Sequence, residues 1–335
     1  TTTVSAGTLA YGANNVIADT ANLSINGGTL ALGSYSDTVG AVTFGTSGGS
    51  ITSTTGVLTG ASYTFNNTSA ATVSAILAGT ANLEQAGAST TTLSGNNTYT
   101  GTTTVSAGTL NVTGTLSDST AVTVATGATY VVGANDTIAS IAGAGNITLT
   151  ANLTAGSAGD TTFSGAMSST GNFTKVGSGT LTLSGPNTYT GTTTVSAGTL
   201  LISNNAGLGT TAGGTLVQSG ATLDLYNVTI GAEAITLAGG TLRDVTSSLA
   251  GNITLTADST ISAGSGDTLT LSGVISGAYG VTKTGAGTVV LSYNNTYTGT
   301  TTVSTGTFNV TSTLSDSTSV TVNAGASYVV GANAT

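Results

Sequence analysis

A phrase of fourteen residues that recurs almost unchanged constrains the fold of this chain more than any other feature. The phrase "NTYTGTTTVSAGTL" occupies residues 97–110 and returns unchanged at residues 187–200. A third copy, "NTYTGTTTVSTGTF", occupies residues 295–308 with two substitutions, and the chain opens on the last nine residues of the same phrase. Such repetition is typical of folds that stack one structural unit many times.

The spacing of the copies suggests a length for that unit. In sequence number, Tyr189 follows Tyr99 by 90 and Tyr297 follows Tyr189 by 108. A longer phrase that begins at Asn111 recurs at Asn309, an interval of 198. These intervals are 5, 6 and 11 times 18, so we predict that the copies differ by whole coils of about 18–20 residues.

The local pattern identifies the unit as a set of short strands. Apolar residues alternate with Thr in segments such as "GTLTLSG" (179–185) and "NITLTA" (146–151 and 252–257). This period of two is typical of half-buried strands, and Thr and Val favour them. Gly, Asn, Ser and Asp fill the gaps, where turns need them. The chain is therefore predicted to be all-β.

Composition shows that the chain can bury a core. Apolar residues make up 38% of it and the mean hydropathy is +0.32, whereas disordered chains combine low hydropathy with high charge. There is no Cys, so disulfides and thiolate metal sites are excluded. Stability must come from packing and from backbone hydrogen bonds.

These observations predict a right-handed parallel β-helix, or β-solenoid, in the form of a single elongated rod. Residues 1–335 would form one continuous solenoid segment made of 90–108-residue repeats, starting and ending in the middle of a repeat. At about 18 residues per coil it would contain about 18 coils. Stacked amyloid is the structural alternative, because the chain is β-prone and nearly uncharged, but frequent Gly turns favour coiling within one chain.

Charge limits the partners. Only 4% of residues are charged, the net charge is −9, and the three cations are Lys175, Lys283 and Arg243. Nucleic acid is excluded as a partner because three scattered cations cannot line a phosphate groove. No apolar run approaches the length of a membrane helix, so we expect no membrane insertion of this segment, and an export signal would lie outside it.

The acidic residues do not predict an enzyme. Asp118 and Asp316 occupy one repeat position in "LSDST" and are expected to be turn residues. Arg243 and Asp244 are the one place where opposite charges adjoin, and neighbours in a strand point to opposite faces. No convergent carboxylate pair is evident, so we predict no catalytic residues and no cofactor.

Two further kinds of binding site were considered. Asp160 and Asp267 follow Gly-rich turns that resemble one repeat of a calcium-binding β-roll, but they lie far apart in the sequence and cannot stack as ligands, so no metal site is predicted. An ice-binding face would need Thr rows on nearly every coil, whereas the Thr-rich phrase recurs only once in five or six coils.

The phrase itself supplies the candidate site residues. A single Tyr in each long repeat is more typical of a packing residue than of a platform for glycans. We therefore assign a structural role to the repeated tyrosines and glycines, which are Tyr99, Gly101, Gly108, Tyr189, Gly191, Gly198, Tyr297, Gly299 and Gly306.

The phrase and the strand before it resemble the autotransporter-associated β-strand repeat, also called the passenger-associated transport repeat. The fullest forms are "KVGSGTLTLSGPNTYTGTTTVSAGTL" (175–200) and "KTGAGTVVLSYNNTYTGTTTVSTGTF" (283–308). That family's pattern starts with Lys-x-Gly-x-Gly-Thr-Leu, which Lys175 and Lys283 supply. The first copy departs from the pattern, because Glu84 and Gln85 stand where the Lys is expected.

The resemblance implies a β-helix on the surface of a Gram-negative bacterium, exported by type V secretion, in which the repeat assists export. We expect a structural protein: the stalk of an autotransporter-type adhesin or a subunit of an extracellular filament. It would be associated with the outer membrane through a region not in this chain, and would stack end to end with copies of itself or with flanking repeats. The alternative is a carbohydrate-binding adhesive module on a β-helix scaffold, with an ice-binding or polysaccharide-degrading β-helix less favoured.

Overall fold

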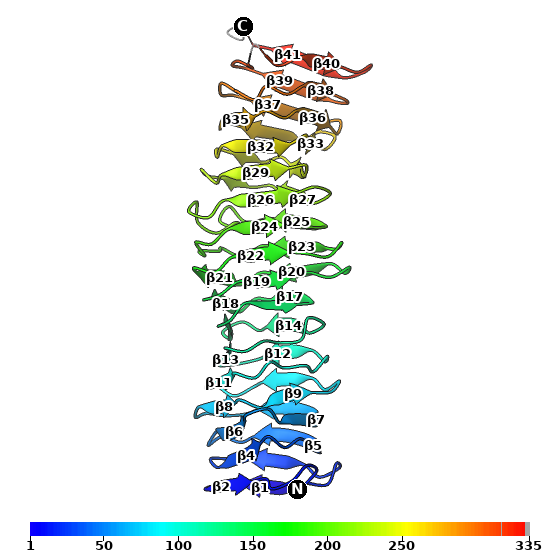
Figure 1. Ribbon diagram of the computed structural model, residues 1–335. Helices are drawn as coiled ribbons and strands as arrows, with labels where there is room; N and C mark the ends of the chain where they lie inside the picture. The colour runs from blue at the N-terminus through cyan, green and yellow to red at the C-terminus, as the bar shows by residue number, and fades with distance from the viewer. Residues whose placement is uncertain (316, 332–335) are drawn as a thin grey trace. The chain divides into compact units, whose positions relative to one another are not determined.

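The computed structural model describes residues 1–315 and 317–331, and their regular secondary structure consists of β-strands. No helix in this described part is long and apolar enough to cross a membrane. Internal contacts divide the chain into two compact units. Unit 1 is Thr1–Ala155 with Ser164–Gly171, and unit 2 is Gly156–Phe163 with Asn172–Thr335. Each unit is a β-solenoid (Figure 1).

Unit 1 winds its strands into parallel sheets that the chain visits in turn. Sheet 1a contains β1 (Thr2–Val4), β3 (Leu23–Ile25), β5 (Asp37–Phe44), β7 (Val57–Phe65), β10 (Leu83–Gln85), β12 (Thr103–Val105), β14 (Ala121–Val124) and β17 (Ser140–Gly143). Sheet 1b contains β2 (Thr8–Ala10), β4 (Thr29–Gly33), β6 (Gly49–Ser53), β8 (Ala71–Val73), β11 (Thr90–Leu93), β13 (Thr109–Val112), β15 (Thr129–Val132), β18 (Asn146–Leu149) and β21 (Ala166–Ser169). Sheet 1c contains β16 (Asp136–Ile138) and β19 (Leu153–Ala155), and β9 (Ile76–Ala78) pairs with the start of β7.

Unit 2 repeats this arrangement with three sheets. Sheet 2a contains β22 (Phe173–Lys175), β24 (Thr193–Val195), β26 (Thr215–Gln218), β29 (Ile235–Ala238), β32 (Ile253–Ala257) and β35 (Ile275–Gly277). Sheet 2b contains β20 (Thr161–Phe163), β23 (Thr180–Leu183), β25 (Thr199–Ile202), β27 (Thr222–Tyr226), β30 (Thr241–Val245), β33 (Ser259–Ala263), β36 (Val281–Thr284), β38 (Thr301–Val303) and β40 (Val320–Val322). Sheet 2c contains β28 (Thr229–Ile230), β31 (Ser248–Leu249), β34 (Thr268–Leu271), β37 (Thr288–Leu291), β39 (Thr307–Val310) and β41 (Ser327–Val330).

Alternation along each strand builds the core. Inward residues stack on the same position of the next coil and form apolar columns. One column of sheet 1b consists of Leu30, Ile51, Val73, Leu93, Val112, Val132 and Leu149, all buried. In sheet 1a the rings of Phe44 and Phe65 stack with centroids 4.8 Å apart. A coil cannot bury such a row alone, so its stability depends on its neighbours. The prediction of an all-β parallel solenoid is confirmed.

The coil length is more variable than the sequence suggested. In sequence number, the pairing of Thr129 with Asn146 advances by 17, whereas the pairing of Thr193 with Thr215 advances by 22. Most other pairings advance by 19 to 21, and that of Leu83 with Thr103 advances by 20. The divisor of 18 was therefore too short, and the chain makes fewer coils than predicted.

The prediction that the copies differ by whole coils is wrong for the second and third copies, which both lie in unit 2. Thr193–Val195 lies in sheet 2a, but the equivalent Thr301–Val303 lies in sheet 2b. Within sheet 2b, Leu200 of the second copy is connected to Val303 of the third copy by five successive strand pairings. The second and third copies are thus separated by five full coils plus the step from sheet 2a to sheet 2b. The right-handed coil and the single continuous rod over residues 1–335 stay predictions.

Candidate functional site

The repeated phrase forms the same local structure each time. With the segment before it, each copy supplies two strands joined by a tight corner, an extended segment that carries the repeated Tyr, and two further strands in the next coil. The strands are β10 to β13 in the first copy, β22 to β25 in the second, and β36 to β39 in the third. The distinctive side chains of the phrase lie at the corners and inside the coil, as the following contacts show.

The Lys of each full copy is buried and holds the corner together. The ammonium of Lys175 donates hydrogen bonds to the carbonyl oxygens of Val176 at 2.7 Å, Gly177 at 2.9 Å and Ala197 at 3.1 Å. The third partner belongs to the next coil. An ammonium has three donors, so three carbonyls satisfy it. The side chain therefore closes the turn after its own strand and ties it to the coil that follows.

Lys283 repeats this arrangement in the third copy. Its Nζ donates to the carbonyl oxygens of Thr284 at 2.8 Å, Gly285 at 2.7 Å and Thr305 at 3.1 Å. Burial lowers the pKa of the Lys283 side chain below its usual value. Burial also lowers the pKa of Lys175, against the opposing effect of the nearby Asp160 charge. The carbonyl oxygens supply the acceptors that water would otherwise provide.

Gln85 takes the place of this Lys in the first copy. Its buried Nε2 donates to the carbonyl oxygen of Gly87 at 2.7 Å and to that of Ser89 at 3.2 Å. A neutral amide therefore fills the same corner with two backbone carbonyls in place of three. The departure from the Lys pattern that the sequence shows is a change of donor and not a loss of the corner.

The repeated tyrosines are fully buried. The hydroxyl of Tyr99 shares a hydrogen bond with Thr103 Oγ1 at 2.6 Å, and the equivalent distances for Tyr189 and Tyr297 are 2.5 and 2.6 Å. Burial raises the pKa of all three tyrosines, that of Tyr297 to about 12. Rings in this position pack inside the solenoid and are not accessible to a glycan.

The repeated glycines lie where coils approach closely. Gly108, Gly198 and Gly306 have φ angles of 58°, 64° and 70°, a region that side chains avoid. A Cβ at these positions would collide with the carbonyl oxygens that the corner Gln or Lys binds, which belong to Gly87, Gly177 and Gly285. A Cβ at Gly101 or Gly299 would collide with the backbone of the coil below. Gly191 holds the same position in the second copy.

Sequence reasoning missed the Asn that opens the phrase. The amide oxygen of Asn97 accepts the N–H of Leu77 at 3.1 Å, and its Nδ2 donates to the carbonyl oxygens of Gly95 and Thr115. Asn295 likewise accepts the N–H of Ile275 at 2.8 Å. Its constant place two residues before the Tyr was a usable signal. These amides connect successive coils at a corner.

A comparison with protein-family models identifies the phrase. The Passenger-associated-transport-repeat matches residues 83–112, 173–202 and 281–310, which are the three segments described above. The chain carries three passenger-associated transport repeats. The first, second and third transport repeats together account for 90 of its 335 residues. Neither the curated proteins nor the solved structures contain a significant match to the chain.

The charged residues that the sequence singled out make local contacts or are exposed, where the structure describes them. Arg243 forms its ion pair with Asp224, across two paired coils, and not with the adjacent Asp244. Asp118 is exposed, and Asp316 lies outside the described residues. Asp160 accepts the N–H of Thr180 at 2.7 Å and thus supports a turn. Within residues 1–315 and 317–331 no three His, Cys, Asp or Glu side chains gather in a way that could hold a metal ion.

Two buried carboxyl groups have strongly shifted pKa values. Burial raises the pKa of Asp136 to about 6, although the N–H groups of Leu116 and Thr137 donate to its oxygens. Burial also raises the pKa of Asp244 to about 6, against the opposing effect of the nearby Ser247 and Thr246. Asp136 lies in unit 1 and Asp244 lies in unit 2.

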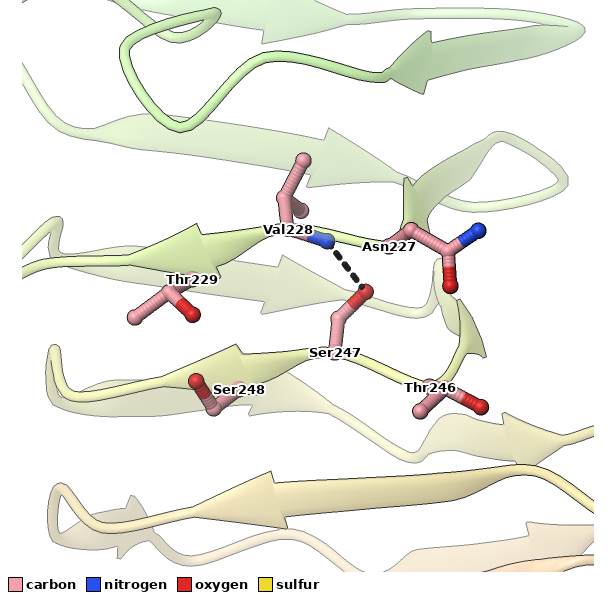
Figure 2. A pocket seen from close by; sticks show the side chains of 6 residues that line it. All are labelled: Asn227, Val228, Thr229, Thr246, Ser247 and Ser248. Atoms are coloured by element: carbon pink, nitrogen blue, oxygen red, sulfur yellow. Dashed lines mark hydrogen bonds between the residues drawn. The ribbon is translucent and has the colours of Figure 1, made fainter.

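A small, neutral hollow lies on the surface of unit 2. It has a volume of about 260 Å³ and is lined by Asn227, Val228, Thr229, Thr246, Ser247 and Ser248. Figure 2 shows that these residues come from two successive coils, with the Ser247 hydroxyl accepting the N–H of Val228 at 3.1 Å. None of the six residues titrates near neutral pH, so the hollow offers no acid, base or nucleophile pair.

Threonines from inside and outside the phrase together form a long row on one sheet of unit 2. The outward row of sheet 2b consists of Thr180, Thr199, Thr222, Thr241, Thr260, Thr282, Thr302 and Thr321, one per coil. This row has a Thr on every coil, although the Thr-rich phrase itself recurs only once in five or six coils. The neighbouring outward row contains Leu201, Asp224 and Arg243, so the two rows do not make the flat Thr-x-Thr plane of an ice-binding face.

Proposed function

We propose that this chain is a structural segment of a bacterial surface protein: the stalk of an autotransporter-type adhesin, or a subunit of an extracellular filament. The observation that carries the proposal is where the transport repeats place their distinctive side chains. The repeated Tyr and Asn side chains, and the Lys or Gln at each corner, lie inside the coil and bind its backbone or its hydroxyl groups. A repeat used this way builds length and offers no chemistry of its own.

The physical properties suit a mechanical role. Each added coil extends a unit by about 4.8 Å of stacked strand and buries its own apolar row against the previous coil. Few titrating groups contribute, so salt has little effect on stability. Both lysines are buried, which removes two of the three sites where a trypsin-like protease could cut. We accordingly propose that the chain has no catalytic activity.

The location and partners belong to the same proposal. Transport repeats are features of autotransporter passengers, which supports a position on the cell surface or outside the cell. We propose attachment to the outer membrane through a region not in this chain. Further copies of the chain, or flanking repeats, would be the partners, stacked end to end so that exposed strand edges pair.

Surface digestion tests the proposal. Intact cells that produce the parent protein are treated with proteinase K, and antibodies against residues 1–335 detect what remains in the cell and in the medium. We expect antibody labelling of unpermeabilised cells or of released filaments, and loss of the cell-bound signal after digestion. A protected signal inside intact cells would contradict it.

A further inference from the structure

Three tyrosines of this chain are largely exposed, in contrast to the buried tyrosines of the transport repeats. Tyr279 is 45% exposed, Tyr293 is 55% exposed and Tyr226 is 47% exposed. Tyr293 lies inside the third transport repeat and Tyr279 lies two residues before it. An exposed tyrosine contributes little to the core, and its ring and hydroxyl are available for contact with a ligand.

The other two repeats show what normally stands at these positions. Position 293 is the thirteenth of its repeat, and the thirteenth residues of the first and second repeats are Gly95 and Gly185. Position 279 corresponds to Ala81 and Gly171. In and just before the third repeat, tyrosine therefore stands at two positions where the other copies have Gly or Ala, while the buried corner and the buried Tyr are the same. The two replacements contribute surface and not core.

The two tyrosines flank one stretch of the solenoid surface. Tyr279 follows β35, and the chain then passes through β36 and β37 (Figure 1) and reaches Tyr293. Residues 295–298 stack directly on β35, since Thr296 N–H donates to Ile275 O at 2.9 Å and Thr298 N–H donates to Gly277 O at 3.0 Å. Tyr293 thus precedes this two-coil stretch, and Tyr279 follows it two residues after the end of β35 at Gly277.

The surface between the two rings is covered by hydroxyl groups. Thr296 and Thr298 are exposed, and Ser276 and Thr254 continue the face on the coils below. Asp258 is exposed beside Tyr279, and its Oδ1 accepts the N–H of Gly280 at 2.7 Å, which fixes the carboxylate in place. Lys283, the nearest cation in sequence, is buried.

The exposed rings, hydroxyl groups and carboxylate indicate which class of ligand this surface could bind. Exposed rings can stack on the flat apolar faces of a sugar, hydroxyl groups can donate and accept, and a fixed carboxylate accepts from sugar hydroxyls. Nucleic acid and acidic polysaccharides would meet Asp258 and no exposed cation. A protein partner would need a continuous apolar patch, which two separated rings do not provide.

We infer that the third transport repeat carries a binding site for a neutral glycan, with Tyr279 and Tyr293 as stacking platforms and the Thr and Ser hydroxyls and Asp258 as polar contacts. The site is an addition to a structural coil, so the inference stands independently of the proposed structural role. Its location on the side of the coil leaves the stacking of the coils undisturbed.

Affinity electrophoresis of the full chain tests the site. Native gels contain graded concentrations of one neutral polysaccharide each: hydroxyethyl cellulose, glucomannan, xylan, galactomannan or dextran. The variants are Tyr279→Ala and Tyr293→Gly, which restore residues that other repeats contain, and the control is Tyr226→Ala, which removes an equally exposed ring. Circular dichroism and thermal melting verify that each variant folds.

We expect at least one neutral polysaccharide to retard the chain. Tyr279→Ala and Tyr293→Gly should each weaken that retardation at least tenfold, and Tyr226→Ala should leave it unchanged, with equal melting temperatures throughout. Three results would overturn the inference: mobility unaffected by every neutral polysaccharide, retardation by acidic polysaccharides alone, or equal weakening by Tyr226→Ala. None of these would bear on the structural role, which is tested on intact cells.

Discussion

Replacing the buried Lys175 tests whether the corner of a transport repeat is held by its side chain. Lys175→Met preserves the length and apolar stem but removes the donor to the carbonyl oxygens of Val176, Gly177 and Ala197. An unsatisfied buried carbonyl costs about 1–3 kcal/mol. Because methionine also avoids the cost of burying an ammonium, we expect a net loss of about 3 kcal/mol.

The first repeat provides the matched variant. Lys175→Gln introduces the residue that occupies this corner at Gln85, where the amide binds two backbone carbonyls. This variant should lose about half as much stability as Lys175→Met. The comparison separates the need for a donor from the need for a charge, since methionine has neither and glutamine has only the donor.

Amide hydrogen exchange is the suitable assay, because coils of a solenoid can open locally without global unfolding. With about 1.4 kcal/mol for each factor of ten, exchange at the corner around residues 176–198 should accelerate about 100-fold in Lys175→Met and about 10-fold in Lys175→Gln. Exchange in unit 1 should not change. Equal protection in the wild type and in Lys175→Met would refute the reasoning, as would a greater loss in Lys175→Gln than in Lys175→Met.

Three further predictions address burial elsewhere. Tyr99→Phe leaves the buried hydroxyl of Thr103 without its partner and should cost about 1–2 kcal/mol in urea unfolding, whereas Tyr226→Phe should cost nothing measurable. The carboxyl of Asp136 has a pKa of about 6 in the folded chain and about 4 in the unfolded chain. The stabilisation of the folded state by this protonated carboxyl is therefore complete below about pH 4 and is lost as the pH rises through 6. The melting temperature should therefore fall between pH 4.5 and 7.5, and Asp136→Asn should flatten that slope; a rise over this range would contradict the assignment. Trypsin should leave the native chain intact, because both lysines are buried and Arg243 lies within strand β30, and should cut all three sites after heat denaturation; rapid native cleavage at either lysine would contradict the burial.

The fold class could be predicted because two sequence features indicate it: the alternation of Thr with apolar residues and the repeated phrase. The coil length could not be predicted, because the corners between strands differ in length from one coil to the next. The corner between Thr193 and Thr215 is long, and the coil from Thr129 to Asn146 is short. A common divisor of the intervals therefore does not measure a coil. Copies of the phrase can also lie in different sheets, because each corner presents the same backbone N–H and carbonyl groups to the next coil.

The interior was harder to predict than the architecture. A structural role for Tyr99 followed from its wide spacing, and the structure places its ring inside the coil. The burial of Lys175 was not predicted, although the amide donor of Gln85 at the equivalent position was a sign that the corner requires a donor. The ion pair between Asp224 and Arg243 depends on which residues face each other in successive coils, which the sequence alone did not fix.

The row of threonines in sheet 2b tests the central claim, that each unit lengthens by one strand spacing per coil. The chain has no Cys, so pairs of cysteines can be introduced in this row and spin-labelled for distance measurement by electron paramagnetic resonance. Pairs of Thr199 with Thr282, with Thr302 and with Thr321 lie four, five and six coils apart, which corresponds to about 19, 24 and 29 Å between backbones. A steady increase of about 4.8 Å per coil is the predicted result. Distances that stop increasing, or that do not follow the order of the coils, would contradict the account.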